Sequence, residues 1–219
     1  MSEKAKPRFP RMAQLKTASE LRNYLTTNGI DLPLDDELSP PTESPFGKSI
    51  ALNSGKTIGN RLCILPMEGW DGTLDGRPSE FTRARWKKFA VSGAKLLFGC
   101  EAVAVCHSGK ANPNQLVLNE ETFPDFVELR ELLLREHAAA FGSTADLVIG
   151  LQLTHSGRFC KPASHSTFES KILYGHPFLN QKFGMAADYP VLTDEEIDGI
   201  IKQYVGAAVL AQKAGFDFV

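Results

Sequence analysis

Short apolar runs alternate with longer, more polar segments from Arg61 onward. The runs have the length of buried strands, and three of the longer segments carry apolar residues at helical spacing. The predicted strands are Leu62–Leu65, Ala94 (or Lys95) to Val105, Leu147–Leu153 and a last one that begins at Phe216. The predicted helices are Ser79–Ser92, Phe123–Phe141 and Asp194–Ala214. This alternation predicts an α/β fold with a parallel sheet.

The last predicted helix has the clearest boundaries. Thr193 can cap its N-terminus, Glu196 completes a capping box three residues later, and Gly215 ends it. The segment Phe216–Val219 then opens like a buried strand, which places a parallel strand at an open sheet edge. The pattern therefore predicts about four parallel strands.

The first part of the chain has a different character. Residues 1–45 form a polar, proline-broken leader with one short helix, which Thr17 and Glu20 can cap as a capping box and Gly29 can end. The predicted division is therefore a leader at 1–45 and a domain at 46–219.

A hairpin is predicted where the domain begins. Ile50–Leu52 and Thr57–Ile58 are short apolar runs that flank a turn sequence, Asn-Ser-Gly-Lys. Gly55 in that turn can take the positive φ that tight hairpins need.

The composition of the chain limits the kinds of molecule that it can be expected to bind. The 24 Lys and Arg nearly balance the 26 Asp and Glu, so the net charge of −2 gives no broad attraction to nucleic acid or to anionic membranes. The chain starts without a secretory signal and holds no apolar run of membrane-spanning length. Its four cysteines form no CxxC pair, and its five histidines have no metal-binding spacing. We expect a cytoplasmic protein that binds a small-molecule substrate and no metal; homo-oligomerisation is left open.

Active sites of barrels built from βα units lie at the C-terminal ends of the strands. After the first strand come Pro66, Met67 and Glu68, with Trp70 close behind; a plain surface turn is the alternative. Within the second strand, Glu101 is a charge in an apolar run. Because a bare buried carboxylate is costly, Glu101 requires either a function or an ion pair. Arg61 and Arg158 are the suggested partners, and Ala102 beside it leaves room for a flat ligand.

The third strand ends in polar residues. Gln152 carries an amide that can donate and accept, which suits the edge of a heterocycle, although a buried structural Gln is the alternative. His155 and Arg158 flank Gly157, and His155 is as easily a structural residue as a catalytic one. Cys106-His107 suggests a thiolate pair only weakly, because neighbouring strand residues face opposite ways. Neither a GxxxxGK[ST] nor a strand-linked GxGxxG motif is present.

Together these stretches resemble the Old Yellow Enzyme family of NAD(P)H:flavin oxidoreductases over residues 46–219. The resemblance lies in Asn60-Arg61 through Pro66-Met67, in Gly93-Ala94 through Cys100-Glu101-Ala102, in Leu151-Gln152-Leu153 with His155-Ser156-Gly157-Arg158, and in Ala214-Gly215-Phe216-Asp217. It implies a (β/α)₈ TIM barrel of which only the N-terminal half, about four strands, is present. It also implies an FMN-dependent enzyme that takes hydride from NADH or NADPH and passes it to an electron-poor C=C bond.

The resemblance also implies residue roles. It places FMN against a set of cofactor-binding residues, Leu65, Pro66, Met67, Glu68, Ala102 and Gln152. Trp70 falls where the family has an aromatic residue that faces the substrate. Glu68 departs from the family pattern, since many relatives carry Thr or Cys there. The catalytic residues stay unknown, because the family's substrate-binding His/Asn pair would follow Val219 and its flavin-phosphate anchors would lie in the second half of the barrel.

Two other interpretations stay open. A flavin-free barrel lyase would need a lysine at a strand end to form a Schiff base, and the predicted strand ends show none. A truncated half-barrel without catalytic activity would bind nothing, or would fold only with a complementary half. We expect this chain alone, as a fragment, to be inactive.

Overall fold

The computed structural model describes residues 9–219. The chain separates into two compact units, and the boundary along the chain falls between Ser44 and Pro45. In the first unit, α1 (Ala18–Thr27) is capped as predicted: the Thr17 side chain accepts from the Glu20 N–H, and the Glu20 side chain accepts from the Thr17 N–H. Gly29 has a φ of 65°, so the predicted helix end is confirmed as well. The first eight residues of the predicted leader lie outside the described residues.

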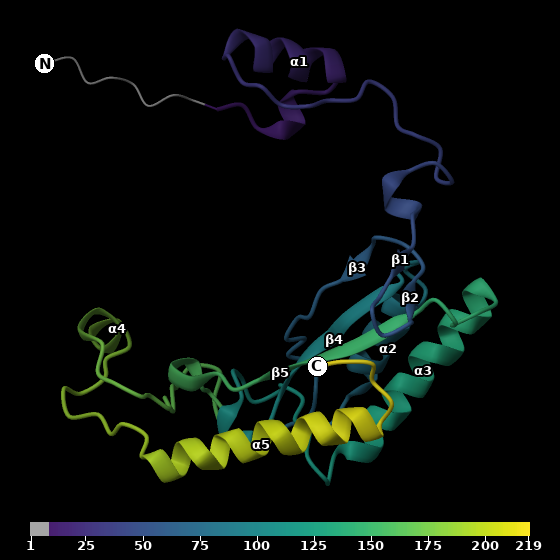
Figure 1. Cartoon of the computed structure of the whole chain (residues 1–219). Helices are drawn as coiled ribbons and strands as arrows, with labels where there is room; N and C mark the ends of the chain where they lie inside the picture. Colours follow the sequence, from purple (N-terminus) through teal and green to yellow (C-terminus); the bar gives the residue numbers. More distant parts are fainter. Residues whose placement is uncertain (1–8) are drawn as a thin grey trace, which may run out of the picture. The chain divides into compact units, whose positions relative to one another are not determined.

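The second unit contains the strands β1 to β5 and the helices α2 to α5 (Figure 1). Their bounds are β1 (Ile50–Ala51), β2 (Thr57–Ile58), β3 (Cys63–Ile64), α2 (Glu80–Ala90), β4 (Leu96–Ala104), α3 (Phe123–Phe141), β5 (Val148–Thr154), α4 (Pro177–Lys182) and α5 (Asp194–Lys213). β1 and β2 form the predicted antiparallel hairpin, with Gly55 at a φ of 84° in its turn.

The three strands β3, β4 and β5 form a parallel sheet in that order. The first and last predicted strands are shorter than expected. β3 covers Cys63–Ile64 only, because the Asn60 side chain takes the Leu62 N–H and Pro66 has no N–H to donate. After α5, a single parallel bridge joins Phe218 to Gly150, since the Asp217 carboxylate rather than the backbone accepts from the Ile149 N–H.

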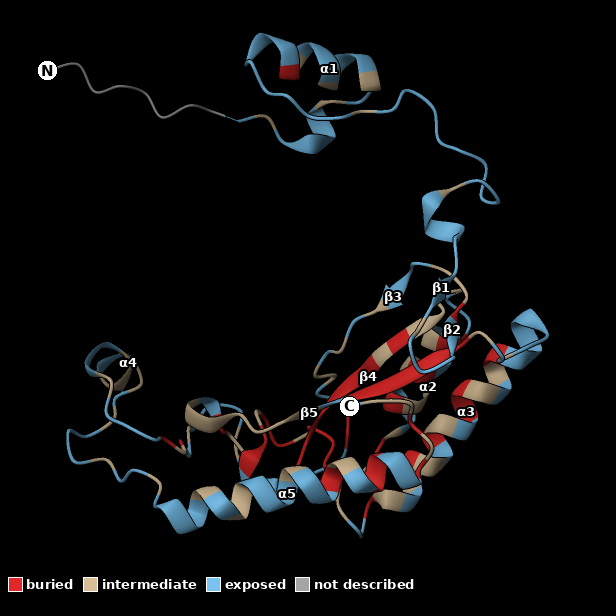
Figure 2. Cartoon of the chain, in the orientation of Figure 1, coloured by how far each residue is buried: buried red, intermediate tan, exposed pale blue. Residues whose placement is uncertain are grey.

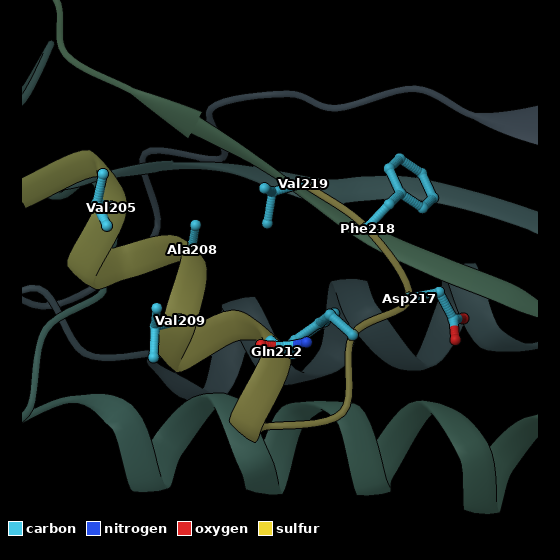
Figure 3. Close-up of a pocket in the computed structure, with 8 residues that line it drawn as sticks. Val205, Ala208, Val209, Gln212, Asp217, Phe218 and Val219 are labelled. Atoms are coloured by element: carbon cyan, nitrogen blue, oxygen red, sulfur yellow. The ribbon is translucent and has the colours of Figure 1, made fainter. Parts of the chain in front are cut away.

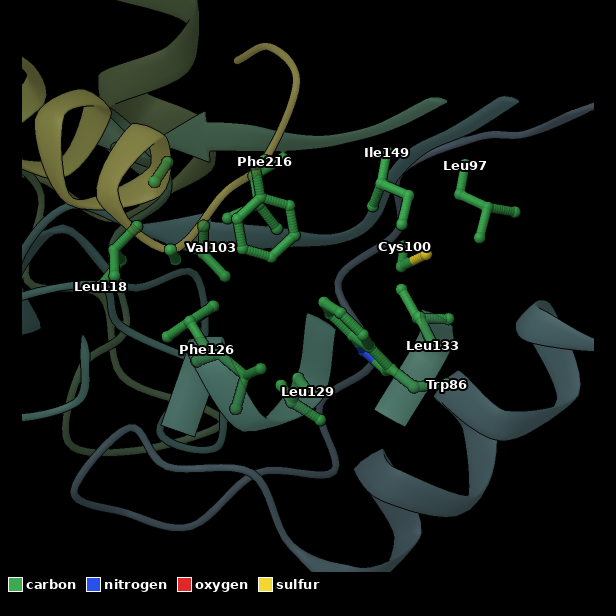
Figure 4. Close-up of a cluster of buried hydrophobic side chains, with 14 of the residues drawn as sticks. Trp86, Leu97, Cys100, Val103, Leu118, Phe126, Leu129, Leu133, Ile149 and Phe216 are labelled. Atoms are coloured by element: carbon green, nitrogen blue, oxygen red, sulfur yellow. The ribbon is translucent and has the colours of Figure 1, made fainter. Parts of the chain in front are cut away.

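Helices α2, α3 and α5 cover one face of this sheet, and the buried side chains gather between the two layers (Figures 2 and 4). The cluster is built from both layers, with Trp86, Phe126, Leu129, Leu133, Leu97 and Ile149 almost fully buried. The predicted helices are confirmed to within two residues at each end, and the Thr193–Glu196 capping box of α5 is present. The six-residue α4 was not predicted, because it is too short to show periodicity.

The opposite face of the sheet carries a different set of side chains. The rings of Phe98 and Phe218 stack there with centroids 5.3 Å apart. A Cβ on Gly150 would lie 2.4 Å from the Phe218 ring, so a larger residue here would displace that ring. Ala102 and Gln152 lie beside each other in the β4–β5 register, further toward the C-terminal ends of these strands.

Candidate functional site

Three chain segments far apart in sequence meet at the C-terminal edge of the parallel sheet. Ala102 on β4 is in register with Gln152 on β5. The Ala102 N–H donates to the carbonyl oxygen of Met67, 3.2 Å away, in the segment that follows β3. Three of the sequence-predicted residues, Met67, Ala102 and Gln152, therefore lie together at this edge.

Most of these side chains are open to solvent. The exposed fractions are 68% for Leu65, 60% for Met67 and 54% for Trp70, and Gln152 is exposed as well. Pro66 and Glu68 are half-buried, and Ala102 is buried. Among the residues that the structure describes, the Gln152 amide has no hydrogen-bond partner. The site thus offers a small buried residue, an unpaired amide and a broad apolar surface.

A bulge in β4 lies directly before Ala102 in the chain. The register with β5 slips between Phe98 and Ala102, where Gly99 has a φ of 81° and Cys100 a φ of 30°. A Cβ on Gly99 would lie 2.8 Å from the Pro66 Cβ and 2.9 Å from the Gln152 nitrogen, so glycine is required for the three strands to approach here. Bulges of this kind redirect side chains and are frequent beside active sites.

A buried ion cluster holds this bulge and the segment after β3. The Glu101 side chain is 1% exposed and forms an ion pair with Arg85 of α2. Arg85 also binds both carboxylate oxygens of Asp71, at 2.8 and 2.9 Å, and the Cys100 carbonyl at 3.1 Å. The second Glu101 oxygen accepts from the Gly69 N–H at 2.7 Å. The suggested partners Arg61 and Arg158 are therefore wrong, although the predicted ion pair itself is present.

Burial and the shared Arg85 guanidinium shift the pKa values of Glu101 and Asp71. Burial raises the pKa of Glu101, against the opposing charge of Arg85. At Asp71, burial also acts to raise the pKa, but the hydrogen bonds from Arg85 and Thr82 outweigh it, so the pKa is lowered. The cluster acts structurally: it fixes Gly69 and Asp71 on either side of Trp70.

Trp70 itself has an unusual backbone. Its φ is 53°, in the left-handed region, which costs a bulky residue about 1–3 kcal/mol and persists only where the surroundings enforce it. Its indole Nε1 donates to the Glu68 carboxylate at 2.9 Å. Glu68 and Trp70, both predicted site residues, thus contact each other.

Gln115 is a site-supporting residue that the sequence did not reveal. It is buried, and its Nε2 donates to the Ala102 carbonyl at 2.8 Å and to the Thr154 hydroxyl at 3.0 Å. Its Oε1 accepts from the Ala111 N–H at 2.6 Å. Gln115 therefore ties the ends of β4 and β5 together, from a loop position that no motif or periodicity marks.

The polar residues after β5 have structural contacts. His155 accepts from the Gly157 N–H at 3.1 Å, and burial and the charge of Lys171 lower its pKa, which favours the neutral ring. Arg158 donates to Asn180 and to the Tyr174 carbonyl. Cys106 has a hydrogen-bond contact to Ser108, 3.4 Å away.

Metal-binding clusters and membrane-spanning helices are absent from the described residues. Over residues 9–219, no group of three or more His, Cys, Asp or Glu is placed to hold a metal ion. Within the same range, no helix is both long and apolar enough to cross a bilayer. The four cysteines are free thiols.

Comparison with known proteins identifies relatives. The sequence model of the NADH:flavin oxidoreductase / NADH oxidase family matches residues 48–219. A probable NADH-dependent flavin oxidoreductase of Bacillus subtilis is 26% identical over 184 residues, which cover 82% of this chain and 44% of the relative. An NADPH dehydrogenase of Listeria monocytogenes is 30% identical over 166 residues, covering 74% and 44%. The chain spans less than half the length of these curated relatives.

Solved structures share the fold. An Old Yellow Enzyme from a Pichia species aligns with a TM-score of 0.61 at 21% identity, over 81% of this chain and 45% of that one. An Old Yellow Enzyme homologue from Zymomonas mobilis aligns with a TM-score of 0.57 at 20% identity, over 78% and 46%. At these identities the likeness concerns the fold alone.

Proposed function

The chain belongs to the NADH:flavin oxidoreductase / NADH oxidase family, and from this we propose that residues 46–219 form the N-terminal half of an FMN-binding (β/α)₈ barrel. Residues 1–45 are a leader in this proposal. The whole protein passes hydride from NADH or NADPH through FMN to an electron-poor C=C bond of a small substrate. The observation that carries the proposal is the meeting of Met67, Ala102 and Gln152 at one sheet edge.

The residues present fit the ring of a flavin. The isoalloxazine ring is flat and largely apolar along one side, and its pyrimidine side alternates N–H and C=O groups. Gln152 supplies an exposed amide without a partner, beside the small side chain of Ala102. Leu65 and Met67 supply exposed apolar surface on the neighbouring segment. Buried polar atoms are rarely left unpaired. A ring that covers the Gln152 amide must therefore supply hydrogen-bond partners, and the N–H and C=O groups of the pyrimidine side do so.

Each residue has a defined part in this proposal. FMN, when bound, supplies the hydride chemistry. Gln152 hydrogen-bonds the pyrimidine edge, and Ala102 allows close approach of the ring to the β4 backbone. Leu65, Pro66 and Met67 line the ring and exclude water from it, while Trp70 forms a wall toward the substrate. Gln115 and the Glu101–Arg85–Asp71 cluster keep these segments in place.

The lysine in the loop after β4 does not support the lyase alternative. Lys110, in the loop after β4, is buried, and its Nζ donates to the carbonyls of Leu74 and Pro113 at 3.0 and 2.8 Å. Burial lowers its pKa, but an amine that donates to two backbone carbonyls is not free to form a Schiff base. The flavin proposal therefore stands first.

Substitution of Gln152 tests the ring contact. In the full-length protein that carries this sequence, Gln152→Leu should raise the Kd for FMN by about 5- to 150-fold, because ring groups left unpaired cost about 1–3 kcal/mol. The thermal midpoint should change little, since the Gln152 side chain is exposed and makes no hydrogen bond in the described chain. Gln181→Leu, at an exposed position on α4, is the matched control and should bind FMN like the parent. A Gln152→Leu Kd within twofold of the parent would rule out the contact.

A further inference from the structure

The hydrogen bond between Trp70 and Glu68 depends on the acceptor oxygen that the side chain at position 68 supplies. The indole Nε1 and the Glu68 Oε2 are 2.9 Å apart. Among the described residues Glu68 forms no ion pair, so the indole is the partner that the structure gives to this carboxylate.

The backbone around Trp70 is fixed independently of this bond. Gly69 is held through its N–H by Glu101, and Asp71 is held by Arg85. A Cβ on Gly69 would lie 1.9 Å from the Arg85 guanidinium, so the chain is packed tightly against the ion cluster here. With the main chain fixed, only the side-chain torsions of Trp70 remain free, and the bond to Glu68 determines where the exposed ring points.

We propose that Glu68 is a positioning residue that holds the Trp70 indole as a fixed wall over the strand-end site and thereby selects flat, unsaturated substrates over bulky ones. This inference rests on the proposed function for its substrate class and for the placement of the Trp70 ring toward the substrate. A rigid aromatic face favours a flat ligand through stacking and resists one with substituents above its plane. An indole released from Glu68 would rotate and lose this discrimination.

Two substitutions separate this role from a direct effect of charge on the flavin. Glu68→Gln keeps an acceptor oxygen at the same reach and removes the charge, whereas Glu68→Leu removes the acceptor as well. The measured quantity is the preference for cyclohexenone over a gem-dimethyl cyclohexenone, as a ratio of kcat/KM values in the full-length protein. We expect Glu68→Leu to lose about three- to tenfold of this preference, the range for one lost hydrogen bond, and Glu68→Gln to retain most of it.

A fluorescence measurement tests the same contact without flavin. Trp70 is 54% exposed and Trp86 is fully buried, so the acrylamide-quenchable emission that Trp70→Phe removes reports Trp70. In flavin-free protein, the anisotropy of this emission should fall in Glu68→Leu and stay near the parent value in Glu68→Gln. Trp70→Phe should remove the quenchable emission and serves as the assignment control, while Glu120→Leu, at an exposed position, controls for loss of a surface charge.

The outcomes are distinct. Equal anisotropy in the parent and Glu68→Leu would overturn the positioning role whether or not the protein binds FMN. Equal loss of preference in Glu68→Gln and Glu68→Leu, with a shifted flavin potential in both, would show that Glu68 acts through its charge and would also overturn it. A protein that binds no flavin but shows the expected anisotropy pattern would contradict the proposed function and leave the Glu68–Trp70 contact supported.

Discussion

The variant Arg85→Met should lose about 3–5 kcal/mol of unfolding free energy, the usual cost of leaving a buried charge without its partner. Arg85 is shared by Asp71 and by the almost fully buried Glu101, and it also binds the Cys100 carbonyl. Methionine fills most of the volume but supplies none of these bonds. Urea unfolding of the parent and the variant at neutral pH measures the difference.

The loss should depend on pH in a defined direction. Burial already raises the pKa of Glu101 above its ordinary 4.5, and removal of Arg85 raises it further. A carboxyl whose folded pKa is raised contributes stability that is present below its unfolded pKa and lost as the pH rises through its folded pKa. The deficit of Arg85→Met should therefore be smallest near pH 4.5 and below, and grow toward neutral pH.

A neighbour on the same helix provides the control. Arg83 forms an ion pair with the 63% exposed Glu128 at 2.8 Å and a longer one with Asp125 at 3.9 Å, and Asp125 would keep its ion pair with Arg77. Arg83→Met should cost less than about 1 kcal/mol, as solvated pairs usually do. Equal losses in Arg83→Met and Arg85→Met would show that the Glu101–Arg85–Asp71 cluster does not stabilise the fold beyond an ordinary surface pair.

On the proposal that this sequence belongs to a longer FMN-binding barrel, residues 1–219 produced as a separate polypeptide should self-associate and bind FMN at least about 100-fold more weakly than the whole protein. Within the described chain, β3 and the Phe218 bridge each have one side without a partner strand. An open hollow of about 360 Å³ lies between α5 and the segment Phe216–Val219, lined by apolar residues such as Val205 and Val209 (Figure 3). Unpaired parallel edges and exposed apolar surface promote association.

The expected loss of FMN affinity has a separate cause. By the family resemblance, the groups that hold the flavin phosphate lie in the second half of the barrel. Charge-assisted hydrogen bonds contribute about 1.5–3 kcal/mol each, so the loss of two corresponds to about 10²- to 10⁴-fold in Kd. Light scattering at two concentrations, a thermal transition and an FMN titration test both expectations. A monomer that melts cooperatively and binds FMN as tightly as the full-length protein would contradict them.

The sequence predicted those features that depend on local patterns. Capping boxes located α1 and α5, because a Thr with a Glu three residues later satisfies the free N–H groups of a helix start, and helical periodicity located α2 and α3. Apolar runs located β4 and β5, because a strand whose two faces are both covered contains few polar residues. Strand lengths were less certain where side chains compete for backbone groups, as Asn60 and Asp217 do.

The site was only partly readable from the sequence. Burial of Glu101 indicated that it needed a partner, yet many arginines could serve, and only packing of α2 against the sheet selects Arg85. Gln115 lies 13 residues from Ala102 in a loop without a motif, so its contact depends on how that loop folds back. The contact of Glu68 with Trp70 is local, but its geometry depends on the positive φ of Trp70, which the ion cluster enforces.

The central claim is that the strand ends of β3, β4 and β5 hold the ring of FMN. Its most direct test is to purify the full-length protein without added flavin, denature it, and identify the released cofactor by chromatography. We expect FMN at close to one molecule per chain in the parent, and a clearly lower content in Gln152→Leu purified in parallel. Recovery of FAD alone, of no flavin, or of equal FMN from both proteins would contradict the claim.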